Sequence, residues 1–299
     1  MNLNTQPHTA DLPTWQPGIL QDARHYQILI LTLLLCLGNT WFQFDIATGQ
    51  VLAVLAAACL TQFLFSLPLK NVSFDPRSPL ITSLSLCLLL KTAVLWIAVL
   101  AAVVAIASKF IFRWNHRHLF NPANLGIVAA ILLTGQAWVS PGQWGGGLWF
   151  GFLLTCLAGL VLFRSHSTDM ALKFIVIYAV GLIARATWLG DPLAIPLHQL
   201  QNGALLIFTF FMISDPKTIP VSPQGRTLFA TLVTLIALAF QFLAFNPTGL
   251  MYALAIAAIT VPFIDKFIPS SHQTSKSKGK PDTVLYPLST QSQAKPLPS

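Results

Sequence analysis

Long apolar runs separated by short polar breaks cover most of the chain. Ten such segments can be delimited, at 26–44, 48–67, 79–90, 93–112, 121–136, 147–163, 171–189, 200–213, 227–244 and 247–266. A helix needs about 20 apolar residues to cross the hydrocarbon core of a bilayer. Runs of this length that do not alternate with polar residues do not fit the strands of a membrane barrel. The pattern predicts an all-α, polytopic membrane protein with about ten transmembrane segments.

Two of these segments, 79–90 and 200–213, are too short to cross a bilayer alone. Polar or proline-rich sequence borders each of them, at 75–79 before the first and at 214–217 after the second. Unusually short segments at equivalent places in two halves indicate a substrate site formed by half-helices. The alternative is that both are short helices packed against longer ones.

Two landmarks occur twice, about 125 residues apart. The sequence Phe-Asn-Pro begins at Phe120 and again at Phe245, and Lys-Thr closes a short apolar segment at Lys91 and again at Lys217. The shared spacing favours a duplication. Because five spans per half is an odd number, the second copy would enter the membrane from the opposite face. The expected arrangement is two inverted five-helix repeats, at 26–136 and 147–266, with the third and eighth segments as half-helices.

Charge is scarce and asymmetric. Only 9% of the residues are charged, and counting ten spans leaves only Lys91 and Arg185, of 17 Lys and Arg, on the face opposite the N-terminus. The positive-inside rule then places both termini in the cytoplasm, in a cell membrane of the bacterial inner-membrane type. The net charge of +8 lies in loops and tail, where lipid head groups suffice as partners and no nucleic acid is needed.

The ends of the chain differ from its middle in composition. Residues 1–25 form a polar cytoplasmic segment, and residues 269–299 are rich in Ser, Gln, Lys and Pro. Such a composition cannot bury enough apolar surface to order itself, so a disordered cytoplasmic tail is expected.

Amides and hydroxyls inside apolar segments are the candidates for chemistry. Asn121-Pro122 and Asn246-Pro247 suit helix starts, since Asn caps helices well and Pro fits the first helical position. Capping does not explain Asn124, a further amide that needs a partner and should face the protein interior. The candidate ligand-binding residues are Asn121, Asn124, Asn246, Thr248, Ser83, Ser214, Asp215 and Lys217.

Several of these candidates have a plain structural interpretation. Asp215-Pro216 can simply end a helix in a turn, or it can form a re-entrant break that faces a ligand or ion. Hydroxyls such as that of Ser83 often join helices in membranes. His116 and His118 lie in a basic loop with no further metal ligands, so no metal site is predicted.

Motifs in both halves resemble a known family. The pattern comprises Ser78-Pro79 before a short apolar segment, Lys109-Phe110 near the end of a long one, Phe120-Asn121-Pro122-Ala123, Phe211-Met212-Ile213-Ser214-Asp215-Pro216, and Gly225-Arg226. Over roughly residues 70–266 it is similar to the RnfD/NqrB family of membrane proteins from the Rnf and Nqr complexes. The resemblance implies a ten-span inverted repeat within a membrane redox complex that couples electron transfer to sodium or proton pumping.

The chain departs from that family at the flavin. The resemblance implies FMN joined by phosphoester to a Thr in a Ser/Thr-Gly-Ala-Thr type motif, but residues 136–147 contain no Thr, and their single Ser140 precedes a Pro. We therefore expect a short member without covalent FMN. A noncovalent flavin (riboflavin or FMN) or a quinone is then the implied cofactor, in a protein that is at most a non-catalytic or flavin-carrying component. Other Rnf/Nqr-like membrane subunits or redox partners are the implied partners.

Two functions remain open on this basis. The first is a membrane component of an Rnf/Nqr-like redox complex, with electron transport coupled to ion transport. The second is a stand-alone channel or transporter for a solute or ion that uses the same inverted-repeat fold, since such repeats are common among transporters.

Overall fold

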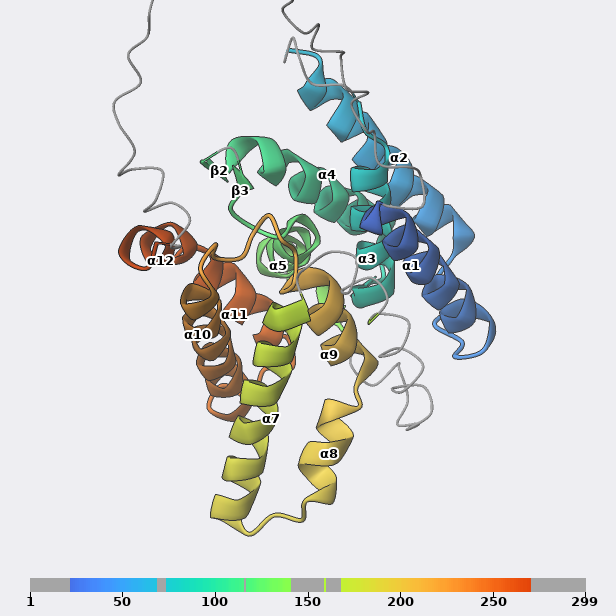
Figure 1. Cartoon of the computed structure of the whole chain (residues 1–299). Helices are drawn as coiled ribbons and strands as arrows, with labels where there is room; N and C mark the ends of the chain where they lie inside the picture. Colours follow the sequence, from blue (N-terminus) through green and yellow to red (C-terminus); the bar gives the residue numbers. More distant parts are fainter. Residues whose placement is uncertain (1–21, 69–73, 116, 141–158, 160–167, 270–299) are drawn as a thin grey trace, which may run out of the picture.

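The computed structural model describes residues 22–68, 74–115, 117–140, 159 and 168–269, and nearly all of its regular structure is helical (Figure 1). The longer helices are α1 (Ala23–Thr40), α2 (Thr48–Ser66), α3 (Arg77–Leu89), α4 (Leu95–Ile111), α5 (Pro122–Thr134), α7 (Thr168–Leu189), α10 (Pro223–Phe242) and α11 (Gly249–Ala258). The shorter ones are α8 (Ala194–Leu200), α9 (Gly203–Ile207) and α12 (Val261–Phe267), with a π-helix at Phe208–Met212. Most of the predicted segment 147–163, of the N-terminal segment 1–25 and of the tail 269–299 lies outside the described residues.

Helices long and apolar enough to cross a membrane confirm a polytopic membrane protein. In the described part of the chain they are α2, α7 and α10, and the pair α11 and α12 forms a fourth candidate, bent by 48° at its break. Four shorter apolar helices accompany them: α3, α4, α5 and the run Gly203–Met212. The predicted short segments 79–90 and 200–213 therefore correspond to α3 and to α9 with its π-helix.

The structure corrects the predicted elements at three places. The last segment, 247–266, forms two helices with a bend between them rather than one helix. Pro262, in the first turn of α12, cannot donate a backbone hydrogen bond to α11. Helix α8 precedes the predicted segment 200–213 and was not expected. The described part of the chain also contains four short strands, although the chain was predicted to be all-α.

Those strands form two small antiparallel ladders next to helix ends. Strand β1 (Leu90–Thr92) pairs with β4 (Ala137–Val139), so the end of α3 is joined to the segment after α5. Strand β2 (Arg113–Trp114) pairs with β3 (Arg117–His118) in the connection between α4 and α5. The β2–β3 ladder holds in place the backbone that leads to Asn121, the residue that caps α5.

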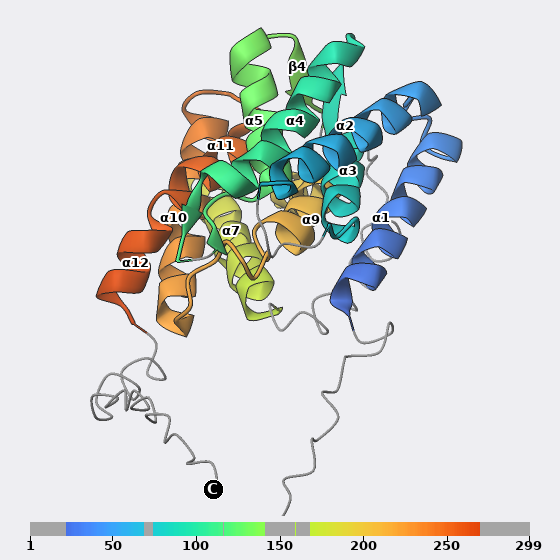
Figure 2. The same cartoon turned by 90° about the horizontal axis from the view of Figure 1, so that it is seen from above.

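The helices form two groups that meet at α5 and α11. In Figure 1 the blue and cyan helices α1 and α2 lie apart from the later helices α7, α10 and α12, with the green α5 between them. Glycine permits close packing of neighbouring helices: Gly126 of α5 faces the backbone of Ala101 in α4, and Gly249 of α11 faces Phe240 in α10. In Figure 2, α1 begins and α12 ends on the same side of the molecule.

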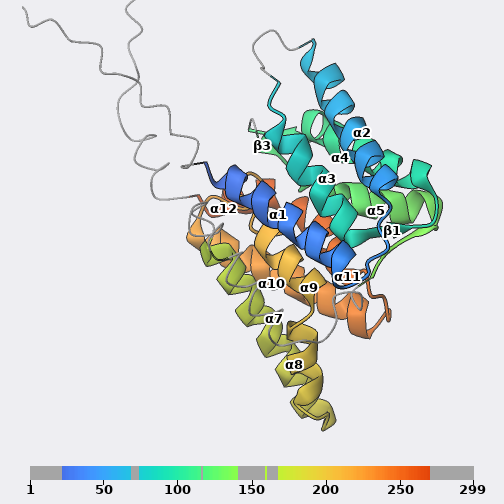
Figure 3. The ribbon, with the colours of Figure 1, turned by 90° about the vertical axis from the view of Figure 1, so that its right-hand side faces the viewer.

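Apolar side chains cover the outside as well as the core. Along α2 and α7 the exposed positions include Leu52, Leu60, Leu64, Leu172, Val176 and Val180, each more than half exposed. Figure 3 shows α7 lying along one edge of the molecule, where one of its faces has no neighbouring helix. An apolar surface this extensive is unfavourable in water and suits the hydrocarbon of a bilayer.

Candidate functional site

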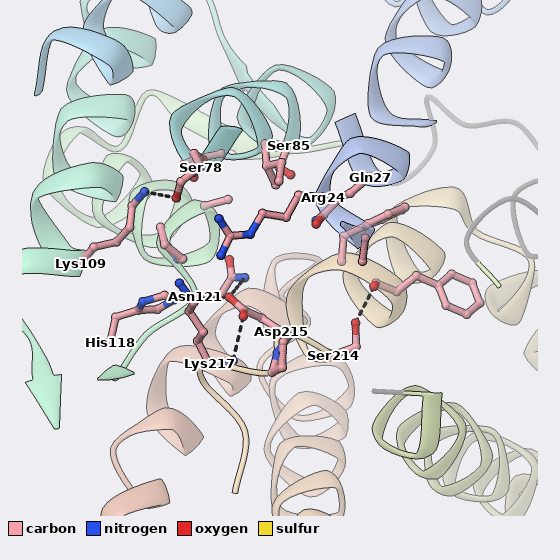
Figure 4. Close-up of a pocket in the computed structure, with 18 of the residues that line it drawn as sticks. Arg24, Gln27, Ser78, Ser85, Lys109, His118, Asn121, Ser214, Asp215 and Lys217 are labelled. Carbon is pink, nitrogen blue, oxygen red and sulfur yellow. Dashed lines mark hydrogen bonds and ion pairs between the residues drawn. The ribbon is translucent and has the colours of Figure 1, made fainter. Parts of the chain in front are cut away.

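A cavity of about 250 Å³ opens where α1, α3, α4 and α5 meet the segment after the π-helix; we call it the charged pocket (Figure 4). Its polar lining residues are Asp22, Arg24, Gln27, Ser78, Thr82, Ser85, Lys109, His118, Asn121, Ser214, Asp215 and Lys217. Four of the eight predicted site residues, Asn121, Ser214, Asp215 and Lys217, therefore share one pocket. Phe210 and Phe211 add aromatic surface to the same wall.

Asn121 performs the capping role that the sequence predicted and also joins the two helix groups. Its side-chain Oδ1 accepts a hydrogen bond from the backbone N–H of Asn124 at 3.1 Å, with Pro122 in the first turn of α5. Its Nδ2 donates across the pocket to the carbonyl of Met212 and to Oδ2 of Asp215, both at 3.4 Å. The amide is 7% exposed, so it spans the seam between segments about 90 residues apart in sequence.

Asp215 is surrounded by donors. The backbone N–H of Lys217 donates to Oδ1 at 3.0 Å, and Nε2 of His118 lies 3.5 Å from Oδ2, an ion-pair distance when the imidazole is protonated. Burial acts to raise the pKa of Asp215, but His118 and the Lys217 N–H outweigh it, so the pKa lies below its ordinary value. The residue forms the predicted turn, and its carboxylate also lines the pocket.

Arg117 holds the segment that carries Asp215. Its guanidinium donates to the backbone carbonyls of Pro216, Lys217 and Ile219, at 2.8, 3.0 and 2.6 Å. Charge-assisted bonds of this kind are about twice as strong as neutral ones. The β2–β3 ladder and Arg117 together fix the position of the 215–219 turn beside the start of α5.

Ion pairs fasten α1 to the entrance of α3 at the rim of the pocket. Arg24 pairs with Asp75 at 2.8 Å, and Arg77 pairs with Asp22 at 2.7 Å and with Asp75 at 2.8 Å. The hydrogen bond from Arg77 lowers the pKa of Asp75. Lys109, near the end of α4, instead donates to the hydroxyl of Ser78 at 2.8 Å and to Oε1 of Gln62 at 3.3 Å.

A second cavity, of about 330 Å³, lies at the start of α11; we call it the amide pocket. Its polar lining residues are Tyr178, Gln199, Asn202, Gln241 and Asn246, and none of its described lining residues carries a charge at neutral pH. The hydroxyl of Tyr178 donates to Oε1 of Gln241 at 2.6 Å. Asn246 is thus the only one of the eight predicted residues among the described lining of this pocket.

The structure corrects the prediction for the second Asn-Pro. Helix α11 begins at Gly249 rather than at Pro247, and its cap residue is Thr248. Asn246 instead accepts a hydrogen bond from the N–H of Thr248 at 2.9 Å within a turn, and Phe245 before it adopts a left-handed φ of 51°. The side-chain amide of Asn246 therefore stabilises a tight turn after α10 and does not cap a helix.

Three predicted residues lie outside the described lining of both pockets. Asn124 is fully buried, as predicted, and its Nδ2 donates to the carbonyl of Met251 in the first turn of α11 at 3.2 Å. Ser83 is buried and donates to the carbonyl of Pro79 at 2.8 Å, a bond within one helix. Thr248 is 6% exposed beside the amide pocket. These contacts are structural, and Asn124 is the one that joins the two helix groups.

Sequence reasoning missed most of the charged side chains of the charged pocket. Arg24, Lys109 and His118 line it, and Arg117 supports it from the side. Each comes from the end of a different element, so only the fold brings them together. Three signals were available. Lys109 stood in a motif used only for the family resemblance, His118 was considered only as a metal ligand, and the grouping of cations at predicted span ends also fits the positive-inside rule.

Comparisons with known proteins agree with the motif resemblance. Residues 137–273 match the model of the NQR2, RnfD, RnfE family. The chain is 32% identical over 121 residues to the D subunit of the ion-translocating oxidoreductase complex of Mannheimia succiniciproducens, covering 40% of this chain and 34% of that protein. Proteins of the same name from Escherichia coli and Shigella boydii are each 32% identical over 148 residues, covering 49% of this chain and 38% of theirs.

These findings confirm the resemblance to the RnfD/NqrB family and define its extent. The chain spans little more than a third of the length of the relatives it matches. The matched segment 137–273 carries Phe210, Ser214, Asp215 and Lys217 of the charged pocket. The first Phe-Asn-Pro, at Phe120, lies before that segment.

Proposed function

We propose that this chain, a relative of the NQR2, RnfD, RnfE family, is an integral membrane subunit of an ion-translocating redox complex. In that role it takes part in electron transport coupled to ion transport, together with other membrane subunits of the Rnf/Nqr type. The family match over residues 137–273 carries the proposal, because the matched segment supplies one wall of the charged pocket. The apolar exterior of α2 and α7 supports a position within the bilayer.

We place a noncovalent flavin in the charged pocket as the ligand that fits its residues best. Phe210 and Phe211 offer surface for a ring system, and Asn121 and His118 offer hydrogen-bonding groups next to it. Such a cofactor, when bound, accepts and passes on electrons. The protein supplies orientation, through the Asn121 cap and the Arg117-held turn, and fixed charge around the site. A quinone ring would suit the amide pocket better, because a quinone is neutral and the described lining of that pocket carries no charge.

We further infer the inverted repeat and ten spans with both termini in the cytoplasm. Several contacts support the inference. Helix α5 packs on α4 through Gly126 as α11 packs on α10 through Gly249, and the first turns of α5 and α11 touch through Asn124 and Met251. Cysteine-accessibility mapping of single-cysteine variants near each terminus tests the topology. Labelling of the two ends from opposite faces would contradict it.

The visible absorption spectrum of the detergent-purified protein tests the redox proposal most directly. We expect flavin absorption in near-stoichiometric amount, released into solution on denaturation because it is not covalently attached. A folded protein without flavin or quinone would favour the alternative, a channel or transporter for a solute or ion. The break between α11 and α12 and the π-helix at Phe208–Met212 are the features that such a function would use.

A further inference from the structure

The charges that line the charged pocket are unevenly compensated. Asp22 pairs with Arg77, Arg24 pairs with Asp75, and Asp215 lies beside His118. Lys109 and Lys217 line the same cavity, yet neither forms an ion pair with a carboxylate in the described part of the chain. Counted over the described lining, the three cations Arg24, Lys109 and Lys217 exceed the two carboxylates Asp22 and Asp215, so one positive charge is left in excess at the cavity.

Lys109 is the inner member of this pair. Its ammonium is partly buried and has only neutral oxygens as partners, from Ser78 and Gln62. Removing a cation from water costs free energy, and pairing with an anion offsets much of that cost. Two hydrogen bonds to neutral oxygens replace only part of the lost hydration. Figure 4 shows the amine of Lys109 pointing from α4 toward the wall formed by Ser78.

Lys217 is the outer member, at the rim. Its side chain is exposed, and its ammonium makes no hydrogen bond among the interactions of the described residues, while its backbone N–H is committed to Asp215. Pro122 and Ala123 of the first turn of α5 line the cavity between the two lysines and Asp215. The start of a 13-residue helix adds partial positive charge there.

We propose that the charged pocket binds an anionic group of the phosphate type between Lys109 and Lys217. The inference rests on the flavin proposal in one respect: a flavin held in this pocket would be the phosphorylated form, FMN, rather than riboflavin. Inorganic phosphate is the other source of the same group. Because the cavity of about 250 Å³ lies below the range of about 300–1,000 Å³ typical of ligand pockets, it encloses only part of a flavin-sized molecule.

Titration of the full-length, flavin-free protein in detergent with FMN, riboflavin and inorganic phosphate tests the proposal. Quenching of flavin fluorescence reports the two flavins, and thermal stabilisation reports phosphate alone. We expect FMN to bind about tenfold or more tightly than riboflavin, and phosphate to displace FMN but not riboflavin. A charge-assisted contact of ordinary strength corresponds to about a tenfold change in affinity.

The matched variants are Lys217→Gln, Lys109→Gln and Lys266→Gln. Lys266, in α12, carries the same charge outside the lining of this pocket. Lys217→Gln should weaken FMN by about tenfold and leave riboflavin unchanged, and Lys266→Gln should change neither. Lys109→Gln should act like Lys217→Gln; if it fails to fold, the exposed position 217 still decides the question.

The outcomes separate this inference from the flavin proposal. Equal affinity for FMN and riboflavin, unaltered by Lys217→Gln, would overturn the anion site and leave the flavin proposal standing. Phosphate stabilisation that is lost in Lys217→Gln, without binding of either flavin, would support the anion site and refute the flavin. No effect of phosphate and no flavin binding would refute both.

Discussion

The charged pocket beside α5 and the amide pocket beside α11 each lie at the start of a helix that follows a Phe-Asn-Pro sequence, but their walls differ. The first gathers carboxylates, lysines, an arginine and a histidine, and the second contains amides and one phenol. Asn121 reaches across its pocket to another segment, whereas Asn246 closes a turn on itself. If the chain arose by duplication, the two copies have kept their backbone landmarks and diverged in chemistry.

The route by which the chain reaches each Asn explains the difference. Phe120 follows β3, where the ladder and Arg117 hold the chain extended, so Asn121 can cap α5. Phe245 comes three residues after Phe242, the last residue of α10, and has a positive φ, so the side chain of Asn246 bonds within the turn and does not cap a helix. A motif of three residues thus has different roles depending on the element that precedes it.

Glycine-to-alanine changes should give the largest difference between the two regions. A Cβ on Gly126 would lie 2.5 Å from the carbonyl oxygen of Ala101 in α4, which is backbone and cannot move aside cheaply. We expect Gly126→Ala to destabilise the protein by about 1–3 kcal/mol. Gly249→Ala should cost somewhat less, since the nearest atom, the Cβ of Phe240, is 2.7 Å away and the nearest backbone atom, the oxygen of Ala237, is 3.2 Å away. Thermal unfolding in detergent measures both.

Gly49→Ala is the control for that pair. Gly49, in the first turn of α2, has open space where a Cβ would stand. The change should be neutral or stabilise by up to about 1 kcal/mol through helix propensity. Equal stability of Gly126→Ala and Gly49→Ala would show that the packing of α5 on α4 is wrong.

Substitution of the two asparagines should separate the pockets by ligand. Asn121→Leu removes the α5 cap and the contacts to Met212 and Asp215, so flavin affinity should fall about tenfold or more. Asn246→Leu should leave flavin affinity within about twofold, because its amide faces the other pocket. Fluorescence titration provides the two affinities. Loss on Asn246→Leu alone would move the flavin to the amide pocket, and retention in both variants would place it elsewhere.

Acid should weaken the charged pocket rather than the amide pocket, whose described lining contains no carboxylate. Because the folded pKa of Asp215 lies below its unfolded value, the carboxylate contributes stability that is complete above about pH 4, the ordinary Asp range. This contribution is lost as the pH falls through the folded pKa. We expect a loss on the order of 1 kcal/mol, seen as a lower unfolding temperature in acid. Asp215→Asn should remove this part of the pH dependence, and an identical profile for the variant would contradict the assignment.

The smallest effects should come from arginines at the two ends of the molecule. Arg77 pairs with Asp22 and Asp75 near the charged pocket, and Arg185 lies 3.5 Å from Asp191 with its guanidinium 3.8 Å from the ring centre of Phe242. Both are more than a third exposed, so Gln at either position should lower the unfolding temperature only slightly.

Salt distinguishes these two arginines. The cost of Arg77→Gln should vanish in about 1 M NaCl, where charges are screened beyond about 3 Å. That of Arg185→Gln should persist in part, because stacking on Phe242 depends less on ionic strength. Unfolding temperatures at low and high salt measure the contrast, and equal salt sensitivity would argue against a role for the ring.

Local features of the fold were accessible from the sequence. The predicted segment 79–90 corresponds to α3, Asn121 and Pro122 begin α5, and Asn124 faces the interior, because apolar run length and capping chemistry act within a few residues. The break between α11 and α12 could be expected in part from Pro262, but the bend of 48° depends on how α12 packs. The short β1–β4 ladder joins segments 45 residues or more apart, so no local sequence pattern predicted it.

The sequence by itself determined that this chain is helical and apolar enough for a membrane, and it named eight candidate site residues, of which Asn121, Ser214, Asp215 and Lys217 line one pocket. Tertiary structure alone decided that Arg24, Lys109 and His118 join them, and that Asn246 faces a separate, uncharged cavity. The physical reason is range: helix formation and capping are settled by near neighbours, whereas the charge balance of a pocket is set by residues that only long-range packing brings together.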